Sequence, residues 1–187
     1  SGTVYLDLHS RPDKFTGSAH FTVQCGCSHT EHIHEHEQNQ DQGQGQGQGQ
    51  GQEQQLPVVA LVFNFPNTNT GGGSESHLLS LNELTTLFHE WGHALHTLLS
   101  RTTYQHLSGT RGTLDFVEVP SHLFEYFAND PRCLKRWAKH HITGETNIPS
   151  GLLEEALFTK NSYESIDASM QILYSLVDQH IFGSRIG

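Results

Sequence analysis

Three segments in the first third of the chain alternate between polar and apolar residues or run apolar, and they are rich in Val, Phe and Tyr. These segments cover residues 3–9, 19–24 and 58–65. Turn-forming residues follow them, such as Pro12 after the first and Pro66 after the third. Short runs of this kind between turns are typical of β-strands. The N-terminal part of the chain therefore predicts a small β-sheet.

Helical spacing replaces this pattern from about residue 80 onward. Apolar residues recur three and four positions apart at Leu84, Leu87, Phe88, Trp91, Leu95, Leu98 and Leu99. Ser80 and Glu83 match a capping box, so a helix is expected over about 80–100. Further helices are expected at about 118–129, 131–142, 150–162 and 165–182, with breaks at Pro131, Gly144 and Pro149. This order predicts an α+β fold, mainly α, in which a small sheet precedes a helical core.

A low-complexity tract separates the second expected strand from the third. From Gln38 to Gln55 the chain is almost wholly Gln and Gly, which cannot build a core. With the His-rich residues before it, this tract predicts a disordered insert at about 27–55 within one domain of residues 1–187. Such an insert costs little stability, because the entropy of loop closure grows only logarithmically with length.

Composition narrows the classes of partner. The formal net charge of −10 argues against nucleic acid. No run of apolar residues approaches the roughly 18 that a membrane span requires, so no membrane partner is expected. Three cysteines with no evident pairing favour a reducing compartment. The oligomeric state is left open.

The segment from His89 to His93 carries the candidate chemistry. Residues four apart share a helix face, so His89 and His93 can hold one metal ion while Glu90 stands beside it as a general base. Gly92 costs about 1 kcal/mol relative to Ala on an exposed helix, which indicates that another segment packs closely there. The other interpretation is an amphipathic core helix whose histidines only form hydrogen bonds.

A catalytic zinc ion takes three protein ligands, so a third ligand is required. Leu99 stands ten residues after His89 (99 − 89), where metzincin peptidases carry a further His, and this excludes that type. The backbone of His96 lies about 10 Å along the helix axis from that of His89, so we expect a packing or indirect role for it. Glu118, on the following helix, is the better candidate. A nearby carboxylate, from Asp115 or Glu125, could accept a hydrogen bond from a metal-bound imidazole, or could lie on the surface instead.

The segments 89–96, 108–111 and 115–121 together resemble the thimet oligopeptidase family of zinc peptidases. Residues 125–130, 13–14 and 20–22 look most like its mitochondrial branch. The similarity covers about residues 3–26 and 56–183. It implies that His89, His93 and Glu118 are the zinc ligands and that Glu90 is the general base, in part of a zincin catalytic domain.

The resemblance also implies a zinc metalloendopeptidase with one Zn²⁺ per chain that acts on peptides or precursor proteins. It implies a role in processing imported precursors in the mitochondrial matrix, with the cytoplasm as the alternative. The family carries a glycine-rich segment with Tyr and His residues, and a long N-terminal helical region, that we do not find here. We therefore expect the catalytic core of a larger enzyme, weakly active or inactive by itself.

A rival function rests on a second cluster. Cysteines and histidines crowd just before the Gln-Gly tract, at Cys25, Cys27, His29, His32, His34 and His36. Cys/His-rich tracts can bind metals, although this spacing matches no closed zinc module. A metal-buffering module is therefore one alternative, and a truncated pseudoenzyme that binds zinc or peptide without turnover is another.

Overall fold

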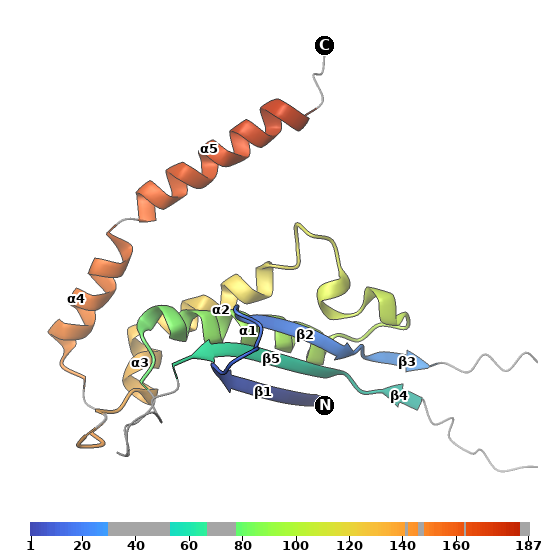
Figure 1. Ribbon diagram of the computed structural model, residues 1–187, viewed down its shortest axis with the longest axis horizontal. Coiled ribbons are helices and arrows are strands. Elements are labelled where there is room, and N and C mark those ends of the chain that lie inside the picture. The colour runs from blue at the N-terminus through green and yellow to red at the C-terminus, as the bar shows by residue number, and fades with distance from the viewer. Residues whose placement is uncertain (30–52, 67–77, 141, 146–147, 163, 184–187) are drawn as a thin grey trace, which may run out of the picture. The chain divides into compact units, whose positions relative to one another are not determined.

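The computed structural model describes residues 1–29, 53–66, 78–140, 142–145, 148–162 and 164–183 (Figure 1). The chain divides into two compact units, residues 1–128 and 129–187, which are described separately below. The sequence was interpreted as one domain, and the candidate metal centre lies entirely in the first unit.

Three strands form the sheet of the first unit. They are β1 (Thr3–His9), β2 (Ala19–Gln24) and β5 (Val58–Phe65), with the bounds that the sequence predicts. The strand order is β1-β5-β2. β5 is central, parallel to β1 and antiparallel to β2. The small N-terminal sheet is therefore confirmed.

One face of β5 makes the core against helix α1 (Leu81–Leu99). Buried and half-buried residues alternate along β5, as expected for a strand with one face against a helix. The buried cluster is Val59, Leu61, Phe63, Phe65 and Ala94, with Val4, Leu8, Leu87, Trp91 and Leu98 packed against it. Because α1 is held against this sheet, the positions of its histidines are fixed relative to the strands.

The start of α1 is fixed by the predicted capping box. The Ser80 hydroxyl accepts from the Glu83 backbone N–H at 3.2 Å. The Glu83 carboxylate accepts from the Ser80 backbone N–H at 2.8 Å. These bonds satisfy two donors that a helix start otherwise leaves unpaired.

The two ends of the expected insert are ordered. β3 (Cys27–His29) pairs antiparallel with β4 (Glu53–Gln55), as a continuation of the β2 and β5 pair (Figure 1). The Ser28 backbone N–H also donates to the Thr102 carbonyl at 3.0 Å. Disorder over the whole of 27–55 is therefore corrected at both ends, where backbone pairing supplies the order that composition did not predict. Residues 30–52 lie outside the described residues.

Two short 3₁₀ helices that the sequence did not predict follow α1. They are η1 (Gln105–Leu107) and η2 (Gly109–Arg111). Gly109 has φ +59°, and a Cβ there would lie 2.7 Å from the Thr97 Cα. Only glycine fits this left-handed position against α1. The chain then enters α2 (Val119–Asn129).

The second unit contains α3 (Pro131–Trp137), α4 (Ser150–Asn161) and α5 (Glu164–Phe182). α3 is shorter than the predicted 131–142. Ala138 is extended, and the His140 backbone N–H donates to the Glu145 carbonyl at 2.8 Å, which closes a turn in place of further helix. The α+β fold, mainly α, is confirmed. Among the residues described, none of the helices has the length and apolar character needed to cross a membrane.

Candidate metal centre

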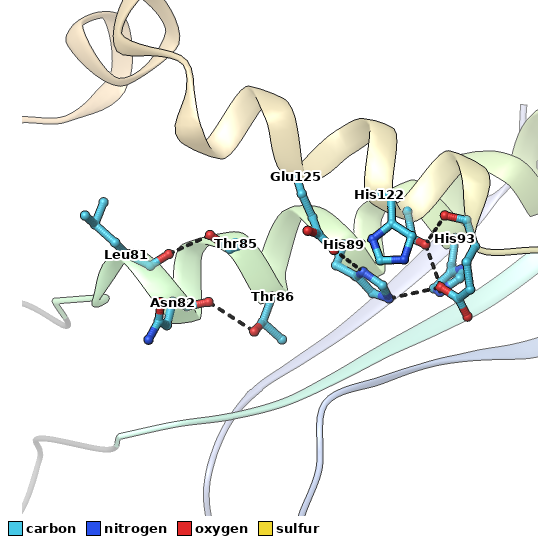
Figure 2. A network of polar contacts seen from close by, with 10 residues as sticks. Leu81, Asn82, Thr85, Thr86, His89, His93, His122 and Glu125 are labelled. Carbon is cyan, nitrogen blue, oxygen red and sulfur yellow. Dashed lines mark hydrogen bonds and ion pairs between the residues drawn. The ribbon is translucent and has the colours of Figure 1, made fainter. Parts of the chain in front are cut away.

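Three predicted metal ligands meet in the first unit. His89 and His93 lie one turn apart on α1, with ring centroids 4.9 Å apart. Glu118 directly precedes α2, and its Oε2 lies 3.4 Å from His89 Nε2 and 3.2 Å from His93 Nε2. Figure 2 shows the two histidines of α1 with His122 and Glu125 beside them. The structure therefore brings together the ligand set that the sequence proposed.

Gly92 allows this meeting of the two helices. A Cβ at Gly92 would lie 2.5 Å from the Pro120 carbonyl oxygen and 2.5 Å from the Ser121 Cα. The sequence predicted close packing at this glycine, and the packed segment is the first turn of α2. Because the backbones touch there, Glu118 is held over the histidine face of α1.

The spacing of the three ligand atoms fits a metal ion. Ligands about 2.1 Å from a tetrahedral zinc lie about 3.4 Å from one another, whereas a charge-assisted N–H···O bond is about 2.7–2.9 Å long. The observed 3.2 and 3.4 Å separations match the first geometry better. His89, His93 and Glu118 could therefore hold one ion.

Glu125 orients the His89 ring from behind. Its Oε1 lies 2.7 Å from His89 Nδ1, so in the neutral ring the proton is on Nδ1 and Nε2, on the side of Glu118, keeps its lone pair for a metal ion. Of the two carboxylates considered from the sequence, Glu125 makes this contact and Asp115 is exposed. His122 Nδ1 lies 3.0 Å from the same Oε1. His89, His122 and Glu125 are also close enough to hold an ion, but 2.7 and 3.0 Å are hydrogen-bond lengths.

Ser121 holds the Glu118 carboxylate. Its Oγ is 2.7 Å from Glu118 Oε2 and 2.8 Å from the Glu118 carbonyl oxygen. This hydroxyl lowers the pKa of Glu118, against a smaller opposing effect of burial, and His93 and His89 also favour the charged form. The carboxylate is thus kept ionised, as a metal ligand must be.

Glu90 is buried beside the three ligands. Burial raises the pKa of its carboxyl, while the charge of His89 and the backbone N–H of His20 oppose the rise. A carboxylate with a raised pKa is a stronger base. It faces a cavity of about 340 Å³ that is lined by Ser18, Ala19, His20, His89, Glu90, His93, Thr110, Val117 and Glu118. This cavity offers room for a water molecule and a substrate group next to the candidate base.

Several residues at the site were missed in the sequence. The His20 ring lies 6.0 Å from the His93 ring, its Nε2 is 3.3 Å from the Thr97 hydroxyl, and burial lowers its pKa to about 4. Strand pairing brings His20 here, and no local pattern signals that. Ser121 could have been found, since it lies one helical turn after Glu118.

For His96 the sequence left a packing or an indirect role open, and the structure shows a packing contact. Its ring contacts Phe116 edge to face, with centroids 6.0 Å apart. In the Cys/His cluster, Cys25 and Cys27 are buried, and neither forms a disulfide bond. His32, His34 and His36 lie outside the described residues, so the metal-binding arm remains a prediction.

Known proteins give the context of this site. The chain is similar to the mitochondrial intermediate peptidase of Arabidopsis thaliana, with 43% identity over 188 residues, covering 98% of this chain and 23% of the relative. The corresponding protein of Eremothecium gossypii is 41% identical over 180 residues, covering 96% and 23%. That of Homo sapiens is 42% identical over 108 residues, covering 58% and 15%. The chain thus spans less than a quarter of the length of these relatives.

The family comparison covers almost the whole chain. The model of peptidase family M3 matches residues 1–185, which include α1 and the segment that carries Glu118. The resemblance drawn from the motifs is thereby confirmed, and the chain belongs to peptidase family M3.

Proposed function

We propose that this chain carries the catalytic centre of a zinc metalloendopeptidase, with His89, His93 and Glu118 as the metal ligands and Glu90 as the general base. The observation that carries the proposal is the convergence of two imidazole nitrogens on one carboxylate oxygen, at 3.2 and 3.4 Å, beside a buried acid. Membership of a peptidase family supports it.

The chemistry divides between the metal and the chain. Bound zinc would act as a Lewis acid that makes a water molecule more acidic and polarises the peptide carbonyl. Glu90, with its raised pKa, takes a proton from the attacking water and delivers it to the leaving amine. Glu125 holds the His89 ring, and Ser121 holds the Glu118 carboxylate, so that neither ligand must reorganise during the reaction.

The names of the relatives extend the proposal to substrate and location. They are called mitochondrial intermediate peptidases, which supports a mitochondrial protein that processes peptides or precursor proteins. Action on imported precursors in the matrix is the finer part of the proposal. It concerns the activity of a whole peptidase, and the chain spans 23% of the length of each of the first two relatives.

The metal assignment is tested by zinc content. After loading and gel filtration, elemental analysis of His93→Ala and Glu118→Ala should show one zinc per chain less than the unsubstituted chain. His180→Ala and Glu155→Ala are matched controls on exposed positions of α5 and α4, and they should keep the full content. The difference in zinc content between the variants and the unsubstituted chain reports on this site alone, since any metal bound to the Cys/His cluster is present in all of them. Equal zinc in all of them would refute the ligand set.

The role of Glu90 is tested by separating binding from turnover. In a full-length version of the protein, Glu90→Gln should keep its zinc and lose hydrolysis of a quenched-fluorescent peptide, because glutamine cannot take the proton. Glu154→Gln, an exposed matched control, should change neither. Hydrolysis that persists in Glu90→Gln, with the same cleavage site by mass spectrometry, would contradict the base assignment.

A further inference from the structure

A second cavity lies near the other end of β2. Its volume is about 310 Å³, and it is lined by Val23, Gln24, Cys25, Gln55, Gln105, His106 and Arg111. The first cavity, at the metal centre, takes Ser18, Ala19 and His20 from the start of the same strand. In the described part of the chain β2 pairs only with β5, so it is an edge strand, the kind of strand with which an extended peptide can pair.

The turn at η2 links the two cavities. Thr110 lines the cavity at the metal centre, and the next residue, Arg111, lines the second. This turn is fixed, because the Gly109 backbone N–H donates to the Ser100 hydroxyl at 3.0 Å and Gly109 packs on Thr97. A peptide that follows β2 from one cavity would therefore reach Arg111 in the other.

The chemistry of the second cavity favours an anion. Among its described lining residues none carries a carboxylate, and Arg111 supplies the one permanent charge. Two neighbouring amides each give one N–H to the backbone, since Gln24 Nε2 donates to the Leu56 carbonyl at 2.8 Å and Gln55 Nε2 to the Cys25 carbonyl at 2.7 Å. The exposed guanidinium of Arg111 remains as a planar donor suited to a carboxylate.

We propose that Arg111 binds a carboxylate of the peptide substrate at a subsite separated from the metal centre by the length of β2. The inference rests on the proposed peptidase function. From Ala19 to Gln24 the strand advances about 16 Å at 3.3 Å per residue, and an extended peptide advances equally. The carboxylate therefore belongs four to six residues from the bond that is cut. An Asp or Glu side chain and the C-terminus of a peptide share this chemistry.

Peptide binding tests the subsite without requiring turnover. The probes are fluorescein-labelled peptides with one scissile bond, in which Asp or Asn is placed in turn at each of six positions on either side of that bond. Their binding to the zinc-loaded Glu90→Gln variant is measured by fluorescence anisotropy. Each peptide is prepared with a free and an amidated C-terminus. Asp should bind about tenfold more tightly than Asn at one position four to six residues from the bond, and more weakly in high salt. If Arg111 binds the C-terminal carboxylate of the peptide, the peptide with a free C-terminus should bind more tightly than the amidated one instead.

Substitution of Arg111 gives the decisive comparison. Arg111→Gln should abolish the preference and leave the affinity for the all-Asn amidated peptide unchanged, while Arg111→Lys should keep part of it. Arg101→Gln removes the same charge from an exposed arginine at the end of α1 and should keep the full preference. Peptide binding with no carboxylate preference, or a preference that survives Arg111→Gln, would overturn this inference alone. Failure to bind any of the peptides would overturn it together with the peptidase proposal.

Discussion

Gly92 of α1 lies against the Pro120 carbonyl of α2 so closely that a Cβ would sit 2.5 Å from that oxygen. The contact involves backbone on both sides, so neither partner can move aside as a flexible side chain would. It sets the distance between the helix that carries His89 and His93 and the residue that carries the third candidate ligand. The bare backbone of a glycine thus sets the geometry of a candidate metal centre to which it contributes no ligand.

Gly92→Ala should therefore damage the site although alanine favours helix. We expect a loss of about 2 kcal/mol in unfolding free energy and at least a tenfold loss of zinc affinity, because α2 must shift. Gly151→Ala on α4 is the control, since nothing lies within 4 Å of a Cβ there, and it should stabilise by up to about 1 kcal/mol. Urea unfolding and zinc competition measure both. Unchanged zinc affinity in Gly92→Ala would show that the helices can separate without cost.

Ser121→Ala tests the hydroxyl that holds Glu118. Without the 2.7 Å contact to Oε2 the carboxylate is free to rotate, and its pKa rises towards the usual value. Zinc affinity should fall about tenfold, and more steeply as the pH is lowered towards 5. Ser175→Ala removes an exposed hydroxyl from α5, where it bonds only to the Gln171 carbonyl among the contacts described, and should have no effect. Equal affinities at every pH would remove Ser121 from the site.

Glu125→Gln tests the contact behind His89. The Glu125 carboxylate contacts both His89 and His122, and a neutral glutamine accepts hydrogen bonds more weakly than a carboxylate. The His89 ring therefore loses its fixed tautomer and orientation. We expect a ten- to hundredfold loss of zinc affinity at neutral pH. Glu155→Gln on α4 is the matched control, and a competition titration with a chromophoric chelator is the measurement. An affinity equal to that of the control would make Glu125 a surface carboxylate.

The sequence predicted those elements whose causes are local. The predicted bounds of β1, β2 and β5 are the same as the observed ones, because each segment itself contains the alternating pattern and the turn residues that define a strand. The capping box placed the start of α1 correctly for the same reason. The meeting of the three candidate ligands could also be predicted, since His89 and His93 share a helix face and Glu118 directly precedes the next helix.

What the sequence missed depends on contacts between distant segments. β3 and β4 are three residues each, and they are ordered because they extend an existing strand pair and bond to Thr102. His20 reaches the candidate metal centre through the pairing of β2 with β5 and the packing of α1. α3 ends at Trp137 because the chain forms a turn between His140 and Glu145 in place of further helix. Gly144 predicted a break in the helix, but at a position several residues after its actual end.

Asp7 should make the first unit sensitive to acid. Hydrogen bonds from Arg11 and Lys14 lower the pKa of its carboxyl from 3.8 to about 2. A pKa that is lower in the folded state means that the stabilisation is complete above about pH 4 and is lost as the pH falls towards 2. The stability difference between the unsubstituted chain and Asp7→Asn, from urea unfolding, should therefore shrink between pH 4 and 2. A difference that stays constant over this range would contradict the ion pair.

Lys14 is the other half of that contact, and its loss should cost more. Its side chain is 3% exposed, and Nζ donates to the carbonyl oxygens of Asp7 at 3.1 Å, His9 at 2.8 Å and Phe63. These bonds tie the end of β1 to β5 where their register shifts between Asp7 and His9. Lys14→Met keeps the length but supplies no donor, so acceptors enclosed by the side chain are left unpaired.

We expect Lys14→Met to lower the unfolding free energy by about 2–4 kcal/mol, because hydrogen bonds from a charged group are each worth about 1.5–3 kcal/mol and some acceptors will find water. Lys139→Met, at an exposed position, should change it by no more than about 0.5 kcal/mol. Asp7→Asn should lower the unfolding free energy less than Lys14→Met does, since it removes one partner of Lys14 and leaves the three carbonyls. If Lys14→Met were no worse than Asp7→Asn at pH 7, the ion pair with Asp7 and not the carbonyl contacts would account for the burial of this lysine.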